Sequence, residues 1–260
     1  MVFVDLLQQA RAVWWMTSDE VGNLLGPFEG PDGPIGTVVA GLEVEWLAPI
    51  HFGQEVVVHV GTTKVGAARF TIWYEIVADG NVVCRARSLM AVISLKTGQI
   101  LRVPADARAY LASIAVEPAP LRDIQRTPVQ DRVRYLAQSR WSDCDAYGHI
   151  NNAQYLEIFQ EARIAMFREQ LKKRSAPVVV ARGDVRFRTQ GSFRAEPHLV
   201  LTSVGRIGTS SFDQNSKMLA DADDPDSIIA EMWTTLVRIG SDGRPLPIPE
   251  DERAVLEQLQ

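Results

Sequence analysis

A polar stretch in the second half of the chain gathers residue types that can perform chemistry at a carbonyl carbon. The stretch is Arg140-Trp141-Ser142-Asp143-Cys144-Asp145-Ala146-Tyr147-Gly148-His149-Ile150-Asn151-Asn152. It ends where apolar residues begin to recur at helical spacing, so its polar groups meet the start of a helix. A carboxylate there can act as a base or a nucleophile, and the unpaired N–H groups of a helix N-terminus can stabilise an oxyanion.

Asp145 is the residue that we expect to carry this chemistry. In a partly buried cleft its carboxylate would attack the carbonyl directly or activate a water molecule, and desolvation would raise its basicity. The backbone N–H groups of about Asn152 and Ala153 would form the oxyanion hole, because the helix dipole favours negative charge at that end.

The neighbouring loop residues have predicted supporting roles. Gly148 lets the backbone turn tightly into the helix, and Asn151 or Asn152 caps it, although both asparagines are equally well explained as substrate ligands. His149 is expected to hydrogen-bond the loop or the substrate. Asp143 is expected to be structural, since loop aspartates commonly bond nearby backbone N–H groups.

Other potentially reactive groups have plainer explanations. Glu161 lies farther along the predicted helix, where a solvated or paired charge is the simplest interpretation. Cys144 alternates in direction with its aspartate neighbours, so we expect it to pack inward and not to act as a nucleophile. Neither cysteine has metal-ligand spacing, and the chain has no Gly-x-Ser-x-Gly elbow, phosphate-binding glycine loop or His-Glu-x-x-His motif. We therefore expect no metal and no cofactor.

The elements that must position the polar loop occur twice in the sequence. Apolar residues recur at helical spacing in two segments, Phe3, Leu6, Leu7, Ala10, Val13, Trp14 and, 152 positions later, Tyr155, Ile158, Phe159, Ala162, Ala165, Met166. Each segment carries an Ala-Arg pair, Ala10-Arg11 and Ala162-Arg163. The two copies also end on a shared Pro-x-Asp-x-Arg-Ala-x-Leu pattern, at 104–111 and 249–256.

Runs rich in β-branched residues follow each predicted helix and indicate strands. In the first copy they are Val38 to Trp46, Glu55 to Val65, Arg69 to Val77 and Val82 to Leu95, and in the second Val178 to Phe187, Leu199 to Gly205, Ser210 to Leu219 and Ile228 to Ile239. One helix followed by hairpin-connected strands predicts an α+β fold in which an antiparallel sheet wraps a long central helix. Two such units in one chain would pair about a pseudo-twofold axis.

The predicted boundaries are a first unit at 1–115, a proline-containing linker at 116–130 and a second unit at 131–260. The Gly/Pro-rich stretch from Gly22 to Gly36 is expected to have no regular structure, and it fits a lid over a pocket and a plain surface loop equally well.

The composition is that of a folded globular protein. Hydrophobic residues make up 46% and charged residues 23%, and the formal charge of −5 is spread without long like-charge runs. These values give no sign of a nucleic-acid or membrane partner. The N-terminal residues lack the pattern of a signal peptide and no apolar run reaches membrane-spanning length, so we expect a cytoplasmic location.

The polar loop resembles the signature of 4-hydroxybenzoyl-CoA-type thioesterases of the hotdog fold, Asp-x-Asp-x-x-Gly-His-x-Asn-Asn-x-x-Tyr. The matching residues are Asp143, Asp145, Gly148, His149, Asn151, Asn152 and Tyr155. The order of elements is also similar to the tandem double-hotdog layout of acyl-ACP and acyl-CoA thioesterases. In similar enzymes the second aspartate is the base or nucleophile, and some hotdog relatives use a helix carboxylate, which here would be Glu161.

This resemblance implies an acyl thioester hydrolase of fatty acid metabolism. The expected catalytic residues are Asp145, His149 and Asn152, and the expected substrate-binding residues are Tyr147, Gly148, Asn151, Ala153, Tyr155 and Glu161. The first copy departs from the pattern, because its opening strand and acidic loop are absent. Either the natural start lies upstream or a partner segment fills that place, and in both cases one motif-bearing site is visible per chain.

The substrate expected from the resemblance is a fatty acyl-CoA or an acyl-ACP, with a homodimer of double-hotdog chains as a further expectation. Carrier phosphates would call for basic residues, for which the candidates are Lys172, Lys173, Arg174, Arg182, Arg186, Arg188 and Arg194. The acyl group would lie between the central helices against residues such as Trp14, Trp15, Phe159 and Met166, which are also explained as plain core.

Two alternatives remain at this point. A non-catalytic acyl-thioester binding module would hold the ligand without turnover, but such a module gains nothing from a carboxylate beside an electrophilic carbonyl. A hotdog dehydratase would call for a different Asp/His arrangement, which the loop does not show.

Overall fold

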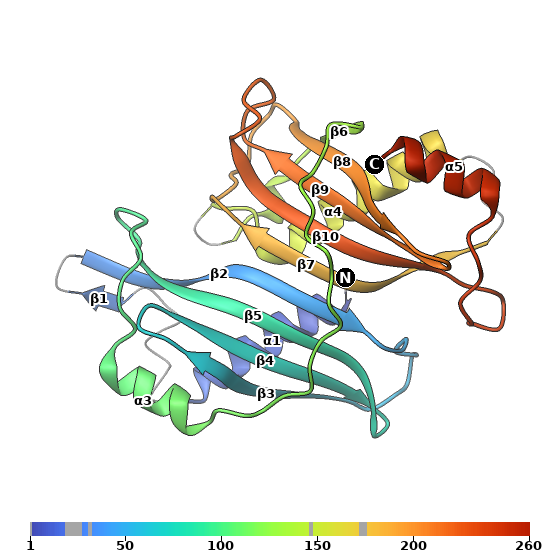
Figure 1. The fold of residues 1–260 in the computed structure, drawn as a ribbon. Coiled ribbons are helices and arrows are strands. Elements are labelled where there is room, and N and C mark those ends of the chain that lie inside the picture. The colour runs from blue at the N-terminus through green and yellow to red at the C-terminus, as the bar shows by residue number, and fades with distance from the viewer. Residues whose placement is uncertain (1, 19–27, 31–32, 146–147, 172–175) are drawn as a thin grey trace. The chain divides into compact units, whose positions relative to one another are not determined.

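The computed structural model describes residues 2–18, 28–30, 33–145, 148–171 and 176–260. The chain divides into two compact units, Met1–Leu121 and Arg122–Gln260, called unit 1 and unit 2 below. Each unit has its own antiparallel sheet and its own long helix (Figure 1).

Unit 1 places the long helix α1 (Val2–Met16) on one face of an antiparallel sheet whose strand order is β3-β4-β5-β2 (Figure 1). The strands are β1 (Phe28–Gly30), β2 (Gly33–Trp46), β3 (Val56–Val65), β4 (Arg69–Ala78) and β5 (Asn81–Ser94). A second helix, α3 (Ala105–Ser113), follows the sheet. Strand β4 alternates between buried and half-buried side chains, which is the period expected when one sheet face packs on a helix.

Unit 2 opens with a strand, β6 (Val133–Ala137), and a short 3-10 helix, η1 (Trp141–Asp143). The long helix α4 (Asn152–Gln170) comes next, followed by β7 (Val178–Phe187), β8 (His198–Ile207), β9 (Ser211–Leu219), β10 (Ile228–Arg238) and helix α5 (Glu250–Gln258). The strand order is β7-β10-β9-β8-β6, with all these neighbours antiparallel. A core cluster joins Met166 of α4 to Val133 of β6, Phe212 of β9 and Leu236 of β10, so the helix and the sheet share one apolar interior.

The two units repeat the same local structure after their last strands. Gly98 and Gly243 both adopt left-handed backbone conformations, with φ of 72° and 75°. Pro104 and Pro249 each precede a nine-residue helix, α3 or α5. Pro has a fixed φ and no N–H to leave unpaired, which explains its place beside a helix start in both copies.

The repeated arginine of the two long helices is buried in both units. Arg11 donates a hydrogen bond from Nη1 to the Tyr74 hydroxyl at 3.2 Å. Arg163 is 8% exposed, and burial lowers its pKa to about 10. The Ala-Arg repeat therefore marks an interior position of each helix and not a solvent-facing charge.

The prediction that Gly22 to Gly36 has no regular structure is wrong for its described part. Gly30 pairs with Gly33 and Phe28 with Ile35, so β1 and the start of β2 form a hairpin. Glycine needs no side chain for this pairing, and Pro34, which has no N–H to donate, accepts the Leu95 N–H through its carbonyl at 2.9 Å. A Cβ at Gly36 would lie 2.9 Å from Leu95 Cδ2, so a larger residue here would displace the leucine side chain. Residues 19–27 and 31–32, where a lid would lie, are outside the described residues.

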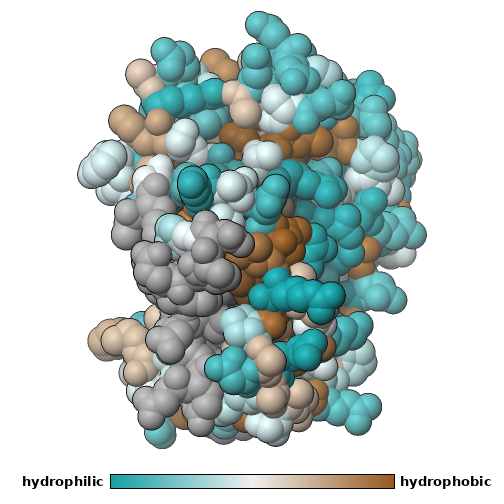
Figure 2. Space-filling view, turned by 90° about the vertical axis from the view of Figure 1, so that its left-hand side faces the viewer, coloured by the Kyte–Doolittle hydropathy of each residue, from teal (hydrophilic) through white to brown (hydrophobic). Residues whose placement is uncertain are grey.

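The strand predictions in both units are otherwise close to the structure. Strand β7 has the predicted bounds, Val178–Phe187, and β8 begins one residue before the predicted start and extends to Ile207. Within the described residues no helix is both long and apolar enough to cross a membrane. On the face shown in Figure 2, hydrophilic residues are interspersed among the hydrophobic ones.

His198, the first residue of β8, makes stability depend on pH. It is 2% exposed, and burial together with the positive charge of Arg194 lowers its pKa below the ordinary 6.5. As pH falls through about 6.5, the unfolded chain takes up a proton at this histidine that the folded chain does not, so stability is lost on acidification. We predict that His198→Gln flattens the fall of Tm between pH 7.5 and 5.5, measured by thermal unfolding. An unchanged slope would assign the pH dependence to other groups.

Candidate active site

The acidic loop of unit 2 is anchored at its first carboxylate. Asp143 Oδ2 accepts a hydrogen bond from the Arg140 N–H at 2.7 Å, and the Asp143 carbonyl accepts one from the Asn151 N–H at 2.8 Å. The first bond closes the η1 turn, and the second ties the turn to the residue before α4. This is the structural role that the sequence predicts for Asp143.

Asp145 closes a tight turn that runs to His149. The Asp145 N–H donates to the His149 carbonyl at 2.8 Å, and the Gly148 N–H donates to the Asp145 carbonyl at 3.0 Å. The His149 N–H donates to Asp145 Oδ1 at 3.2 Å, which fixes the direction of the carboxylate. Gly148 has φ of +79°, a left-handed conformation that favours glycine, so the predicted reason for a glycine here is correct.

The Asp145 side chain is exposed, whereas the sequence analysis expects it in a partly buried cleft. The turn explains this difference, because one carboxylate oxygen is used by the loop backbone and the loop lies at the surface of unit 2. Tyr147, predicted as a substrate-binding residue, lies outside the described residues.

The N-terminus of α4 lies immediately beyond this turn. Asn151 is the cap, since its Oδ1 accepts the Ala153 N–H at 3.0 Å. The bond engages the Ala153 N–H, one of the two backbone donors predicted for the oxyanion hole. The Asn152 N–H has no hydrogen-bond partner within the described parts of the chain, and it stands at the positive end of the helix dipole.

Tyr155 holds the loop from the interior. Its ring packs edge-on against Phe187 at 5.2 Å between centroids, and its hydroxyl accepts the Gly191 N–H at 3.0 Å. The Gly191 carbonyl in turn accepts the Ile150 N–H at 2.8 Å. A Cβ at residue 191 would lie 2.5 Å from the Tyr155 hydroxyl oxygen, so the segment after β7 must have glycine here.

Burial raises the pKa of Tyr155 to about 12, and negative charge at Asp145 and Cys144 contributes in the same direction. The phenol therefore stays neutral at physiological pH. With a side chain only 3% exposed, Tyr155 has the geometry of a positioning residue. Gly191 is not among the site residues predicted from the sequence, in which its signal is a glycine in the polar segment between β7 and β8.

His149 and Cys144 are held by backbone bridges on the two sides of the turn. Cys144 forms an antiparallel bridge with Ile150, and His149 forms one with Ser192. Both residues are half-buried. The described residues offer no hydrogen bond to the His149 ring, and the hydrogen bonds that hold this residue are those of its backbone.

Glu161 is paired with a tyrosine of β6. Its Oε2 accepts a hydrogen bond from the Tyr135 hydroxyl at 3.1 Å, and the carboxylate is exposed. Burial and this hydrogen bond both raise the pKa of Tyr135. The contact agrees with the interpretation of Glu161 as a paired charge.

The basic residues proposed as carrier-phosphate ligands have intramolecular contacts wherever the structure describes them. Arg182 pairs with Asp184 at 2.6 Å, and Arg188 pairs with Glu231 at 2.6 Å. Arg186 lies 5.5 Å from the centre of the Trp233 ring, and Arg194 donates to the carbonyl oxygens of Glu196, Pro197 and Ala220. These arginines thus stabilise the sheet and its loops. Residues 172–175 lie outside the described residues.

The predicted acyl-chain residues differ in their surroundings. Trp15, Phe159 and Met166 are each at most 1% exposed and belong to the interiors of their units. Trp14 is half-buried. Across the described ranges, no group of His, Cys, Asp or Glu side chains has the arrangement of a metal site.

A conservative change at Tyr155 tests its positioning role. Tyr155→Phe leaves the buried Gly191 N–H without its acceptor, which costs about 1–3 kcal/mol. We predict a lower Tm together with faster hydrogen exchange at the amides of Ile150 and Gly191, measured by NMR. If the exchange at both amides is unchanged, the hydroxyl does not hold the loop. Tyr135→Phe, which removes a hydrogen bond to Glu161 in the middle of the same helix, is the matched control and should leave these two amides unaffected.

Comparison with known proteins supplies the family and supports the fold. The family model described as the thioesterase-like superfamily matches residues 2–111 and 139–259. Among solved structures, the 12:0-ACP thioesterase from Umbellularia californica aligns with a TM-score of 0.68 at 15% identity, covering 91% of this chain and 86% of that one. An acyl-ACP thioesterase from Bacteroides thetaiotaomicron aligns with a TM-score of 0.58 at 16% identity, covering 78% and 76%.

A curated relative matches over a shorter stretch. A chloroplastic acyl-[acyl-carrier-protein] hydrolase from Cuphea viscosissima is 29% identical over 84 residues, which cover 30% of this chain and 20% of that protein. The match therefore spans only a fifth of the relative's length. The family model, in contrast, covers most of both units, and on that ground the chain belongs to the thioesterase-like superfamily, with the hotdog-type fold of that superfamily.

Proposed function

We propose that this protein hydrolyses acyl thioesters and releases a carboxylic acid from acyl-CoA or acyl-ACP. The observation that carries the proposal is the geometry around Asp145. An exposed carboxylate, directed by the His149 N–H, precedes a helix whose Asn152 N–H has no partner within the described residues. Family membership and the names of the relatives support the same reaction.

The proposed chemistry needs a base or nucleophile and an oxyanion site, and the loop supplies both. As a base, Asp145 takes a proton from water, and the hydroxide oxygen adds to the thioester carbonyl carbon. The carbonyl oxygen becomes an oxyanion that the Asn152 N–H and the helix dipole stabilise. The carbon–sulfur bond then breaks, and the thiolate leaves and takes up the proton.

As a nucleophile, Asp145 itself adds to the carbonyl carbon, and the thiolate leaves from a mixed anhydride that water then hydrolyses. Single-turnover hydrolysis in ¹⁸O-labelled water separates the two routes. Attack of water on the anhydride can place the label in the Asp145 carboxylate, whereas activation of water places it in the released acid alone.

The layout that we propose is a tandem double hotdog with an active site in unit 2. Two features support it: the family model matches one stretch in each unit, and unit 2 carries the acidic loop before its long helix. The proposed substrate is a fatty acyl thioester, since the named relatives are acyl-ACP thioesterases.

The central prediction concerns Asp145. Asp145→Asn keeps an acceptor for the His149 N–H but removes the base or nucleophile, so thiol release should fall by about a hundredfold or more. Release is measured with a thiol reagent on acyl-CoAs of short to long chain and an aromatic acyl-CoA, and on acyl-ACP. If wild type and variant both bind the thioester and neither releases thiol, the protein is a non-catalytic binding module and the hydrolase proposal is wrong.

Glu161 provides a second, contrasting prediction. Glu161→Gln keeps an acceptor for the Tyr135 hydroxyl and removes the Glu161 carboxylate from α4. If Glu161 is only a paired charge, kcat/KM should stay within about threefold of wild type, a change of under ~1 kcal/mol in transition-state free energy. A loss as large as that of the Asp145 variant would transfer the role of base to the helix carboxylate.

A further inference from the structure

Two exposed aromatic side chains flank the acidic loop of unit 2. Trp141, the first residue of η1, is 75% exposed, and Phe193, in the segment between β7 and β8, is 45% exposed. All six tryptophans of the chain are described, and Trp141 alone among them is exposed. The Trp141 and Phe193 ring centroids lie 6.2 Å apart with an interplanar angle of 88°, which is an edge-to-face contact. Two large apolar rings are thus paired in solvent.

The backbone places this aromatic pair beside the proposed active site. Trp141 begins η1, which ends two residues before Asp145. Ser192, the residue before Phe193, forms an antiparallel bridge with His149. Antiparallel pairing at that bridge sets Phe193 alongside the glycine of the Asp145 turn. Two segments far apart in the sequence therefore hold the two rings at the edge of the turn.

The Trp141 indole also presents an available hydrogen-bond donor. Trp233 of the same unit donates its Nε1–H to the Thr127 carbonyl at 2.8 Å. The Trp141 Nε1–H has no acceptor among the residues that the structure describes. An exposed ring face with an N–H at its edge suits a ligand that alternates apolar groups with amides, because the face packs on methyl and methylene groups and the N–H bonds an amide carbonyl.

The pantetheine arm is the part of an acyl thioester that has this chemistry. It joins the thioester sulfur to the rest of coenzyme A or to an acyl carrier protein, and it consists of two amides, methylene groups and a geminal dimethyl group. The first amide lies only a few bonds from the reacting carbon. The second amide and the geminal dimethyl group lie farther out, where a side chain that flanks the turn can reach them. The adenine ring of coenzyme A is more distant still, beyond the arm and the phosphates.

Given the proposed function, on which this step rests, we propose that Trp141 and Phe193 bind the outer half of the pantetheine arm. Trp141 packs against the geminal dimethyl group and donates its Nε1–H to the carbonyl of the second amide. Phe193 holds the indole edge-on in the position that receives the arm. Because coenzyme A and acyl carrier protein present the same arm, the pair contributes to the binding of both kinds of substrate.

The test compares hydrolysis of thioesters that share one acyl group. Acyl-N-acetylcysteamine ends after the first amide, acyl-pantetheine carries the whole arm, and acyl-CoA and acyl-ACP carry the arm and its carrier. In wild type, kcat/KM should rise by about tenfold or more from the N-acetylcysteamine to the pantetheine thioester. Trp141→Ala should lower that ratio by about fivefold or more, and Phe193→Ala should lower it in the same direction. Trp141→Phe, which keeps a ring face, should restore part of it.

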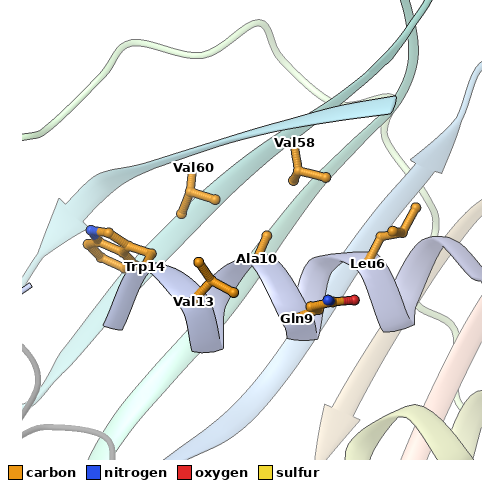
Figure 3. Close-up of a pocket in the computed structure, with 7 residues that line it drawn as sticks. All are labelled: Leu6, Gln9, Ala10, Val13, Trp14, Val58 and Val60. Atoms are coloured by element: carbon orange, nitrogen blue, oxygen red, sulfur yellow. The ribbon is translucent and has the colours of Figure 1, made fainter. Parts of the chain in front are cut away.

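Unit 1 supplies the control variants. Phe52 is an exposed phenylalanine between β2 and β3, and Phe52→Ala should leave the ratio unchanged. Trp14 lines the apolar groove between α1 and β3, together with Val58 and Val60 (Figure 3). Any effect of Trp14→Ala through the acyl group is common to the two thioesters, so the ratio should again stay the same. A loss of folded structure likewise lowers kcat/KM for both substrates equally, and thermal unfolding checks each variant.

A binding measurement distinguishes failure of this proposal from failure of the proposed function. Ketone analogues in which a methylene group replaces the thioester sulfur are not hydrolysed, and calorimetry gives their Kd. The pantetheine analogue should bind about tenfold more tightly than the N-acetylcysteamine analogue, and Trp141→Ala should remove most of this difference whether or not the protein hydrolyses thioesters.

Three results would overturn the proposal. The first is a Trp141→Ala protein whose ratios of kcat/KM and of Kd match those of wild type. The second is a loss confined to acyl-CoA, which would assign the aromatic pair to the adenine ring. The third is a loss confined to acyl-ACP, which would assign the pair to the protein surface of the carrier.

Discussion

The geometry of the candidate site depends on how the chain enters α4. Asn151 caps the helix through the Ala153 N–H, while its own N–H is bonded to the carbonyl of Asp143. These two bonds restrict the turn that begins at Asp145. Asp143, before the turn, and Asn151, after it, are bonded to each other, and Asn151 is bonded to the first turn of α4. The interaction is short-range and sequence-local, so the Asp145 turn and the positive end of the α4 dipole are joined without a long-range contact.

Tyr155 adds the long-range part of the same constraint. Its hydroxyl binds Gly191, and Gly191 binds Ile150, so the segment after β7 locks the loop onto the sheet of unit 2. Arg182 and Arg188, in and just after β7, form ion pairs with Asp184 and Glu231. The described contacts of Asp143 and Tyr155 thus hold the loop, and those of the two arginines belong to the sheet.

The sequence predicts the parts of this structure that depend on local patterns. The β-branched run Val178 to Phe187 is the strand β7, and the loop glycine at 148 has the left-handed conformation that its position suggests. The hairpin formed by β1 and the start of β2 is not predictable in this way, because glycine and proline signal a turn and the short backbone pairing on either side of it leaves no pattern of alternating apolar residues. The Tyr135–Glu161 contact and the contact of Tyr155 with Gly191 also depend on residues brought together only by folding.

The central claim is that the thioester carbonyl binds between Asp145 and the Asn152 N–H. The most direct measurement is a crystal structure of the Asp145→Asn protein with an acyl-CoA analogue whose thioester is replaced by a non-hydrolysable ketone. The account predicts the ketone oxygen within about 3 Å of the Asn152 nitrogen, a normal hydrogen-bond distance, with the carbonyl carbon beside the residue 145 side chain. A ketone held against Glu161, or bound away from the start of α4, would contradict it.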